Sequence, residues 1–281
     1  MELEPPGIIP PDDDPVLGRD PAVERVEQAL DAGRDEEALS LAEQALAAGE
    51  GNRLDLLFLA GDALLALGRP GAAETRFRGV LELDPECPTS RCWLAMALYR
   101  QCRFDEARAE CDRALAADQP APDAHVVDGL LLEREADFVA ADESFEQAAR
   151  VDPGRFHPPV RMSRQEFDRQ VRLAARRLPR QFRKHLERVP VIVQDIPAIE
   201  LLRGDGELDP DLLGLFDGVP LPETADSLEV RPNTIYLFQR NLERAARDLD
   251  DLIEQISITL YHELGHYLGF EEEDMDDLGL A

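Results

Sequence analysis

Small residues recur at a fixed interval through the first half of the chain. Four alanines are separated by 35, 34 and 34 residues, and a second set of small residues repeats at 34: Ala38, Ala73, Ala107, Ala141 and Gly61, Ala95, Gly129. Small side chains at matched helix positions let two helices approach closely. Pro85 and Pro153 each follow an aspartate at the end of a repeat, where proline stops a helix from continuing. The pattern predicts an array of about four helix pairs over residues 21–153.

This period resembles that of the tetratricopeptide repeat (TPR), an α-helical solenoid whose stacked helix pairs form a concave surface. The resemblance implies a surface that binds a protein or peptide partner. An array that only supports a neighbouring domain would carry the same pattern. The third repeat also holds five arginines, which could bind an acidic peptide terminus or form a solvated face balanced by neighbouring acids: Arg91, Arg100, Arg103, Arg108 and Arg113. The second interpretation is favoured.

Beyond the repeats the hydrophobic pattern changes and predicts a small α+β domain over residues 163–281, joined to the array by a linker at 154–162. Ser163 and Glu166 form a capping box at the start of a helix that ends near Leu178, and a second helix follows. The remaining elements are expected as strands at 189–193 and 234–238, short helices at 199–203 and 241–247, and a Gly/Pro-punctuated loop at 212–220.

Basic residues concentrate at the start of this second part. Residues 155–188 hold eleven of the chain's thirty lysines and arginines against three acids. This stretch could dock onto the acidic repeat array or bind an acidic segment of a substrate. Amphipathic helices with solvated arginine faces would have the same composition, and that interpretation is favoured.

The clearest chemical pattern lies on a predicted helix that begins at Leu249. Its apolar positions recur at spacings of three and four, which marks one face of a helix: Leu252, Ile253, Ile256, Leu260, Leu264 and Tyr267. His262 and His266 are four residues apart, so they project from the same side. Two imidazoles placed in this way can reach one tetrahedral zinc ion, and Glu263 lies beside them to hold a water molecule.

A catalytic zinc ion requires a third protein ligand. The acidic run after His266 is the expected source, with Glu272 first and Asp274 second. If the helix continued, Glu272 would point away from the histidine face. Gly269 can adopt a left-handed conformation, end the helix and turn the chain back toward the metal.

The combination of these motifs resembles a small bacterial metallopeptidase family, described as a minimal zincin or minimal matrix-metalloprotease-like domain. The resemblance covers residues 162–279 and rests on five segments: 162–167, 214–220, 235–238, 262–266 and 269–274. It implies an α+β zincin-type fold, a zinc ion (Zn2+) held by His262, His266 and Glu272, and Glu263 as the catalytic base. It also implies a peptide substrate, which we expect to lie extended along the strand at 234–238 and to add to the sheet edge.

Charge and composition exclude other classes of function. The net charge of −29 argues against nucleic acid and anionic membranes as main ligands. Residues 1–20 are acidic and proline-rich, which is typical of a disordered tail and unlike a secretory signal. The four cysteines fall in one region without a C-x-x-C pair and are expected as small core residues in a reducing compartment. A cytoplasmic protein without a membrane span is therefore expected.

The sequence thus predicts a TPR solenoid followed by a zincin-like domain. The leading hypothesis is a zinc-dependent metallopeptidase that hydrolyses peptide bonds through a zinc-bound water and a glutamate base, with the repeats recruiting a partner or substrate. The alternative is a TPR interaction scaffold whose zinc-binding domain is structural or latent. A zinc hydrolase acting on non-peptide amides is a third hypothesis.

Overall fold

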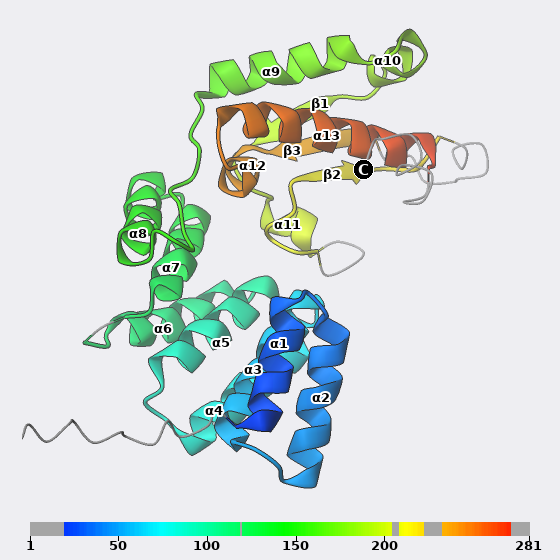
Figure 1. Ribbon diagram of the computed structural model, residues 1–281. Coiled ribbons are helices and arrows are strands. Elements are labelled where there is room, and N and C mark those ends of the chain that lie inside the picture. The colour runs from blue at the N-terminus through cyan, green and yellow to red at the C-terminus, as the bar shows by residue number, and fades with distance from the viewer. Residues whose placement is uncertain (1–19, 119, 204–207, 222–231, 271–281) are drawn as a thin grey trace, which may run out of the picture. The chain divides into compact units, whose positions relative to one another are not determined.

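A computed structural model describes residues 20–118, 120–203, 208–221 and 232–270, which form thirteen helices and three strands (Figure 1). The chain divides into two compact units, residues 1–69 and 70–281. Domain boundaries at 153 and 163 stay a prediction. The tail expected at the N-terminus lies, up to residue 19, outside the described residues.

Eight helices make up the repeat region, confirming the expected solenoid of helix pairs. They are α1 (Pro21–Asp31), α2 (Asp35–Ala48), α3 (Arg53–Ala66), α4 (Pro70–Leu83), α5 (Pro88–Arg100), α6 (Phe104–Leu115), α7 (Pro122–Arg134) and α8 (Phe138–Val151). Proline occupies the first position of α1, α5 and α7, where its missing N–H would be unpaired in any case. Pro85 and Pro153 follow the ends of α4 and α8.

The turn within each helix pair has the same backbone geometry in all four repeats. One residue of each turn has a positive φ, between 55° and 67°: Gly33, Gly68, Cys102 and Ala136. In each case the next residue's N–H bonds to a carbonyl five residues back, as Arg103 does to Leu98 at 3.0 Å. Because this bond satisfies an otherwise unpaired carbonyl at the helix end, it stabilises the turn. Cys102 and Ala136 adopt the conformation despite the steric cost of a side chain there.

The matched alanines have the packing role that their spacing predicts. Ala38, Ala73, Ala107 and Ala141 are all fully buried. Three of the four cysteines are buried and the fourth is half-buried, as expected for small core residues.

The remaining helices and strands are α9 (Arg164–Arg177), α10 (Arg180–Leu186), β1 (Val191–Gln194), α11 (Ile199–Leu202), β2 (Gly214–Asp217), β3 (Thr234–Phe238), α12 (Gln239–Ala245) and α13 (Leu249–Leu268). Ser163 caps α9 by accepting a hydrogen bond from the Glu166 N–H at 3.3 Å, as the capping box predicts. Helix α12 begins two residues earlier than expected.

The three strands form one sheet in the order β1-β3-β2, with β1 parallel and β2 antiparallel to β3. Two expectations are corrected by this topology. Residues 214–217 lie within the stretch expected to be a loop, yet they pair with β3 as strand β2. Strand β3 is central, so its backbone groups are already paired on both sides and a substrate cannot add to it. The outer strands are β1 and β2.

One face of this sheet is covered by α9 and α13, which also contact each other (Figure 1). The shared core contains Phe167 of α9, Ile235 and Leu237 of β3, and Leu260 of α13, all fully buried. The Tyr261 hydroxyl donates to the Ala174 carbonyl at 2.9 Å and ties α13 to α9. This packing fixes the position of α13, which carries the candidate site.

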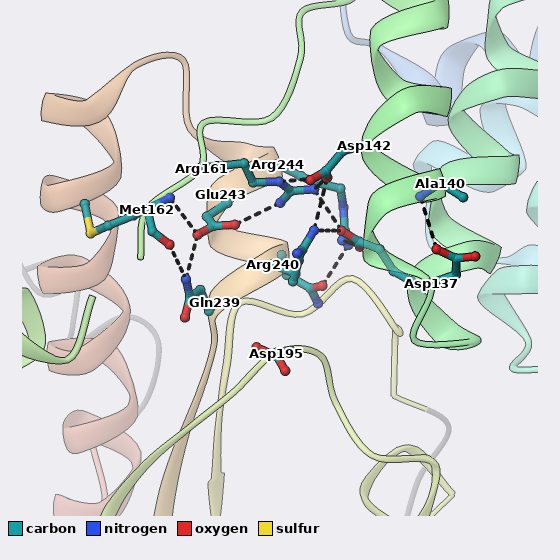
Figure 2. Close-up of polar contacts among 12 residues, drawn as sticks. Asp137, Ala140, Asp142, Arg161, Met162, Asp195, Gln239, Arg240, Glu243 and Arg244 are labelled. Carbon is teal, nitrogen blue, oxygen red and sulfur yellow. Dashed lines mark hydrogen bonds and ion pairs between the residues drawn. The ribbon is translucent and has the colours of Figure 1, made fainter. Parts of the chain in front are cut away.

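Charged side chains join the last helix pair of the array to α12, as Figure 2 shows around Arg161, Asp142, Arg240 and Glu243. Arg161 pairs with Glu133 of α7 at 3.0 Å and with Glu243 of α12 at 2.9 Å, and it also contacts Asp142 of α8. Glu133 and Glu243 are almost fully buried. Arg161 therefore bridges two buried carboxylates from distant parts of the chain. Arg155 also pairs with Asp123 of α7 at 2.8 Å, so two arginines of the basic stretch contact acids of the array.

Among the described helices, none is both long and apolar enough to cross a membrane.

Candidate metal and active site

Helix α13 presents the predicted apolar stripe to the core. Leu252, Ile256 and Leu260 are fully buried, and Leu264 nearly so. Asp248 caps the helix by accepting hydrogen bonds from the N–H groups of Asp250 and Asp251 at 3.0 and 2.9 Å. An N-cap aspartate also interacts favourably with the positive end of the helix dipole. The helix is thus held at its start and along one face, so its last two turns have a defined direction.

His262 and His266 meet at the surface of this helix. Their Nε2 atoms are 3.0 Å apart, and their rings are nearly perpendicular, with an interplanar angle of 89°. Two imidazole nitrogens bound to a tetrahedral zinc ion at 2.0–2.1 Å would lie about 3.3 Å apart. Both the donor type and the convergence of the two nitrogens therefore fit a zinc ion.

Gly269 ends the helix as its sequence position predicts. Its φ of 81° is left-handed, and the Phe270 N–H bonds back to the Gly265 carbonyl at 3.1 Å. The predicted third ligands, Glu272 and Asp274, lie outside the described residues, so they stay predictions. Within the described ranges, no cluster of three or more His, Cys, Asp or Glu side chains could hold a metal ion.

Glu263 is buried, with 6% of its surface exposed, and lines a cleft of about 510 Å³ together with His266. The cleft lies against β2, where Gly214, Leu215 and Phe216 contribute to its wall. A Cβ atom on Gly214 would lie 2.9 Å from both Cγ and Oε1 of Glu263, and 2.6 Å from Cγ2 of Thr259. A larger residue at this position would therefore require the Glu263 or Thr259 side chain to shift.

The segment that precedes β2 also contributes to the wall of the cleft, including Leu208, Asp209 and Leu212. Burial raises the pKa of Asp209, and the Arg100 guanidinium opposes this shift. Arg100 lies at the end of α5 and pairs with Asp209 at 2.7 Å. A residue of the repeat array therefore holds a cleft-wall carboxylate.

Other residues of the array bond to the same segment. The Tyr99 hydroxyl donates to Asp211 at 3.1 Å, and Arg134 of α7 donates to the Pro210 carbonyl at 3.0 Å. In return, Arg203 donates to the Cys102 carbonyl at 3.2 Å. The array and the cleft wall are thus joined by several polar contacts.

These contacts refine the interpretation of the arginine cluster in the third repeat. As favoured from sequence, Arg103 and Arg108 are balanced by acids of the repeats, Glu74 and Asp128. Arg100 differs, because its acid partner comes from the cleft wall. The sequence did not predict this role of Arg100. It also did not predict the role of Gly214, which was indicated only by its place in segment 214–220, one of the five segments that resemble the metallopeptidase family.

Comparison with known families agrees with both parts of the sequence interpretation. Residues 186–280 match a family described as zincin-like metallopeptidase, and residues 58–122 match the tetratricopeptide repeat. The chain therefore carries a zincin-like metallopeptidase domain and TPR repeats. A search of curated proteins finds no match to this chain.

Several solved structures, two of them described as TPR proteins, are similar to about half of this chain. TTC0263 from Thermus thermophilus is 21% identical over 47% of this chain and 73% of that chain, with a TM-score of 0.43. MamA from Desulfovibrio magneticus RS-1 is 21% identical over 54% and 80%, with a TM-score of 0.40. YrrB, a TPR protein with an unusual peptide-binding site, is 23% identical over 48% and 69%, with a TM-score of 0.39.

Proposed function

We propose that this protein is a zinc-dependent peptidase whose active site is built on α13. His262, His266 and Glu272 hold the zinc ion, and Glu263 is the general base. The observation that carries the proposal is the convergence of the two histidine Nε2 atoms beside a buried glutamate that lines a cleft. The match of residues 186–280 to zincin-like metallopeptidases supports the general class of reaction.

A bound zinc ion would polarise the scissile carbonyl and lower the pKa of the attacking water toward about 7. Glu263 accepts the proton of that water and passes it to the leaving amine nitrogen. Because Glu263 is buried, bulk water competes less for its carboxylate. Gly214 leaves space for the Glu263 carboxylate beside the cleft. Glu263 therefore carries out both proton transfers in this proposal.

The peptide substrate is placed along β2 rather than along β3. Strand β2 pairs with β3 on one side, and its residues line the cleft that contains Glu263 and His266. An extended peptide can add its backbone hydrogen bonds to such an outer strand while its side chains occupy the cleft.

The TPR array has two roles in this proposal. Through Tyr99, Arg100 and Arg134 it supports the cleft wall, and through surfaces not used by these contacts it binds a protein partner or substrate. A cytoplasmic site of action is also part of the proposal. The buried cysteines, which pack as small core residues of the repeats, are typical of a reducing compartment.

Mass-spectrometric detection of new peptide termini in a complex peptide library tests the proposal. The full chain is compared as the zinc-loaded protein, after removal of zinc by a chelator, and after zinc is restored. We expect cuts with the zinc-loaded and restored samples and none after chelation. If a protein that holds one zinc ion per chain makes no cut, the peptidase proposal fails and the latent or structural domain becomes the better interpretation. Hydrolysis of small amides alone would support the non-peptide hydrolase.

Replacing Gly214 with alanine should lower kcat by about 10²-fold, because an ångström-scale displacement of a catalytic group has effects of this size. The added methyl would overlap Glu263 and Thr259. Bound zinc should stay at one ion per chain. Gly71→Ala is the matched control, since a Cβ there would lie 3.8 Å from Gln101 Oε1, an ordinary contact. Equal kcat values for native protein and Gly214→Ala would refute the positioning role of Gly214.

A further inference from the structure

A second groove lies between α9, α10 and β1, at the opposite edge of the sheet from the candidate active site. Its volume is about 710 Å³, larger than that of the cleft beside Glu263. Apolar residues from all three elements line it, including Val171, Leu186 and Val191. The groove is therefore an apolar surface that the proposed peptidase chemistry does not use.

Arginines surround this apolar surface. Arg164, Arg172, Arg176 and Arg183 line the groove, against two acids, Asp168 and Glu187. Arg164 pairs with Asp168 and Asp195, and Arg183 donates to two backbone carbonyls. Arg172 and Arg176 are exposed and make no ion pair with the described part of the chain.

Arg172 and Arg176 are also four residues apart on α9, so two like charges lie on the same side of the helix. Such a pair is locally unfavourable, and Asp168, the acid four residues before Arg172 on α9, pairs with Arg164 at 3.6 Å. In a chain of net charge −29, a groove lined by four arginines and two acids is a local exception. Guanidinium groups bind carboxylates by charge-assisted hydrogen bonds.

The edge of β1 offers backbone groups beside these arginines. Ile235 donates to the Pro190 carbonyl, so the alternate residues Val191 and Val193 turn their N–H and C=O groups away from β3. The Arg164 guanidinium reaches the Val193 carbonyl from that side. Strand β1 itself carries no charged residue, and Ile192 is 41% exposed, whereas outer strands are commonly protected by charges or proline.

We propose that this groove binds an extended acidic peptide of a protein partner, in which carboxylates alternate with apolar side chains. The apolar side chains lie against Val171, Leu186 and Val191, and the carboxylates pair with Arg172 and Arg176. The peptide backbone bonds to the outer edge of β1. The local positive charge of the groove favours a short acidic peptide that contacts only the groove, whereas nucleic acid and anionic lipid surfaces would also meet the rest of a chain of net charge −29. The groove would dock a partner independently of cleavage at the α13 site.

Fluorescence anisotropy with a labelled synthetic peptide tests this proposal. Valine alternates with glutamate over eight positions in the probe, and a counterpart has lysine in place of glutamate. The full chain carries Glu263→Gln so that the probe stays intact. We expect the glutamate peptide to bind at least about tenfold more tightly than the lysine peptide, and more weakly as salt is raised.

The groove variant combines Arg172→Glu with Arg176→Glu, and its matched control combines Arg169→Glu with Arg180→Glu. Both change the net charge equally at exposed positions, but only the first pair lines the groove. We expect the groove variant to lose at least about tenfold in affinity and the control to change by less than about twofold. Equal losses in both variants would overturn the proposal, because they would indicate unspecific attraction.

Hydrogen exchange provides a readout that needs no substitution. The glutamate peptide should slow amide exchange in β1 and leave β2 unchanged. If exchange in β1 stays the same at saturating peptide, the groove is not the binding site. Tighter binding of duplex DNA or phosphatidylserine vesicles than of the glutamate peptide would likewise overturn the proposal.

Discussion

Glu263→Gln should lower kcat for peptide cleavage by about 10²- to 10⁴-fold, the range that a positioned general base contributes. Glutamine has nearly the same shape as glutamate, so it fits the space beside Gly214 without a new overlap. Its amide cannot accept the proton of the attacking water. The zinc content should stay the same, because the proposed ligands are unchanged. Turnover of a peptide chosen from the library experiment, together with elemental analysis of zinc, measures both effects.

Glu254→Gln is the matched control for this substitution. Glu254 lies on the same helix, is exposed, and is not among the residues that line the cleft. The control should keep the native kcat. If Glu263→Gln cleaves as fast as the control while both hold zinc, Glu263 is not the base. Native protein and Glu263→Gln are therefore purified side by side several times. If cleavage appears in both proteins in some preparations and in neither in the others, the activity belongs to a contaminating protease.

Glu133→Gln should lower the free energy of unfolding of the unit 70–281 by about 3–5 kcal/mol, the usual effect of removing one partner from a buried ion pair. Glu133 pairs with Arg161 at 3.0 Å and also contacts Arg240 and Arg244. Burial lowers the pKa of Arg244, but the carboxylates of Glu133 and Asp211 outweigh this and the pKa is raised overall. Without the Glu133 carboxylate, three arginines lose their shared partner.

Urea denaturation followed by the fluorescence of Trp93, the chain's only tryptophan, measures this loss. Trp93 lies on α5, in the same compact unit as Glu133. Glu146→Gln is the control, because Glu146 and its partner Arg150 are both more than half exposed. An exposed pair of this kind contributes about 0–1 kcal/mol. A Glu133→Gln midpoint equal to that of the control would show that the buried network does not stabilise the unit.

The parts of the structure that were predictable from sequence depend on contacts between near neighbours along the chain. The repeat of 34 residues follows from helices that pack on the next helix, so Ala107 and Ala141 could be placed correctly without any distant information. The apolar stripe of α13 and the left-handed Gly269 are likewise local features. The approach of His262 and His266 follows from helical spacing alone.

The features that sequence reasoning missed depend on residues far apart in the chain. Strand β2 is four residues long and begins with glycine, so it has too few side chains for an alternating pattern. The central position of β3 depends on two pairings that no local pattern reveals. Arg100 and Asp209 are separated by 109 residues, and only the folded structure shows that they are partners. For the same reason, the contact of Gly214 with Glu263 was not foreseen.

The Glu133 cluster has a consequence for how this protein is made. Glu133 and Arg244 are 111 residues apart, so α7 leaves the ribosome long before its arginine partner on α12. At synthesis rates of 5–20 residues per second, the delay is about 6–22 s. During that interval the Glu133 carboxylate can pair with Arg161, 28 residues further along the chain, but not with Arg240 or Arg244. The last helix pair therefore acquires its full set of ion pairs only when the region that carries the candidate active site has been synthesised.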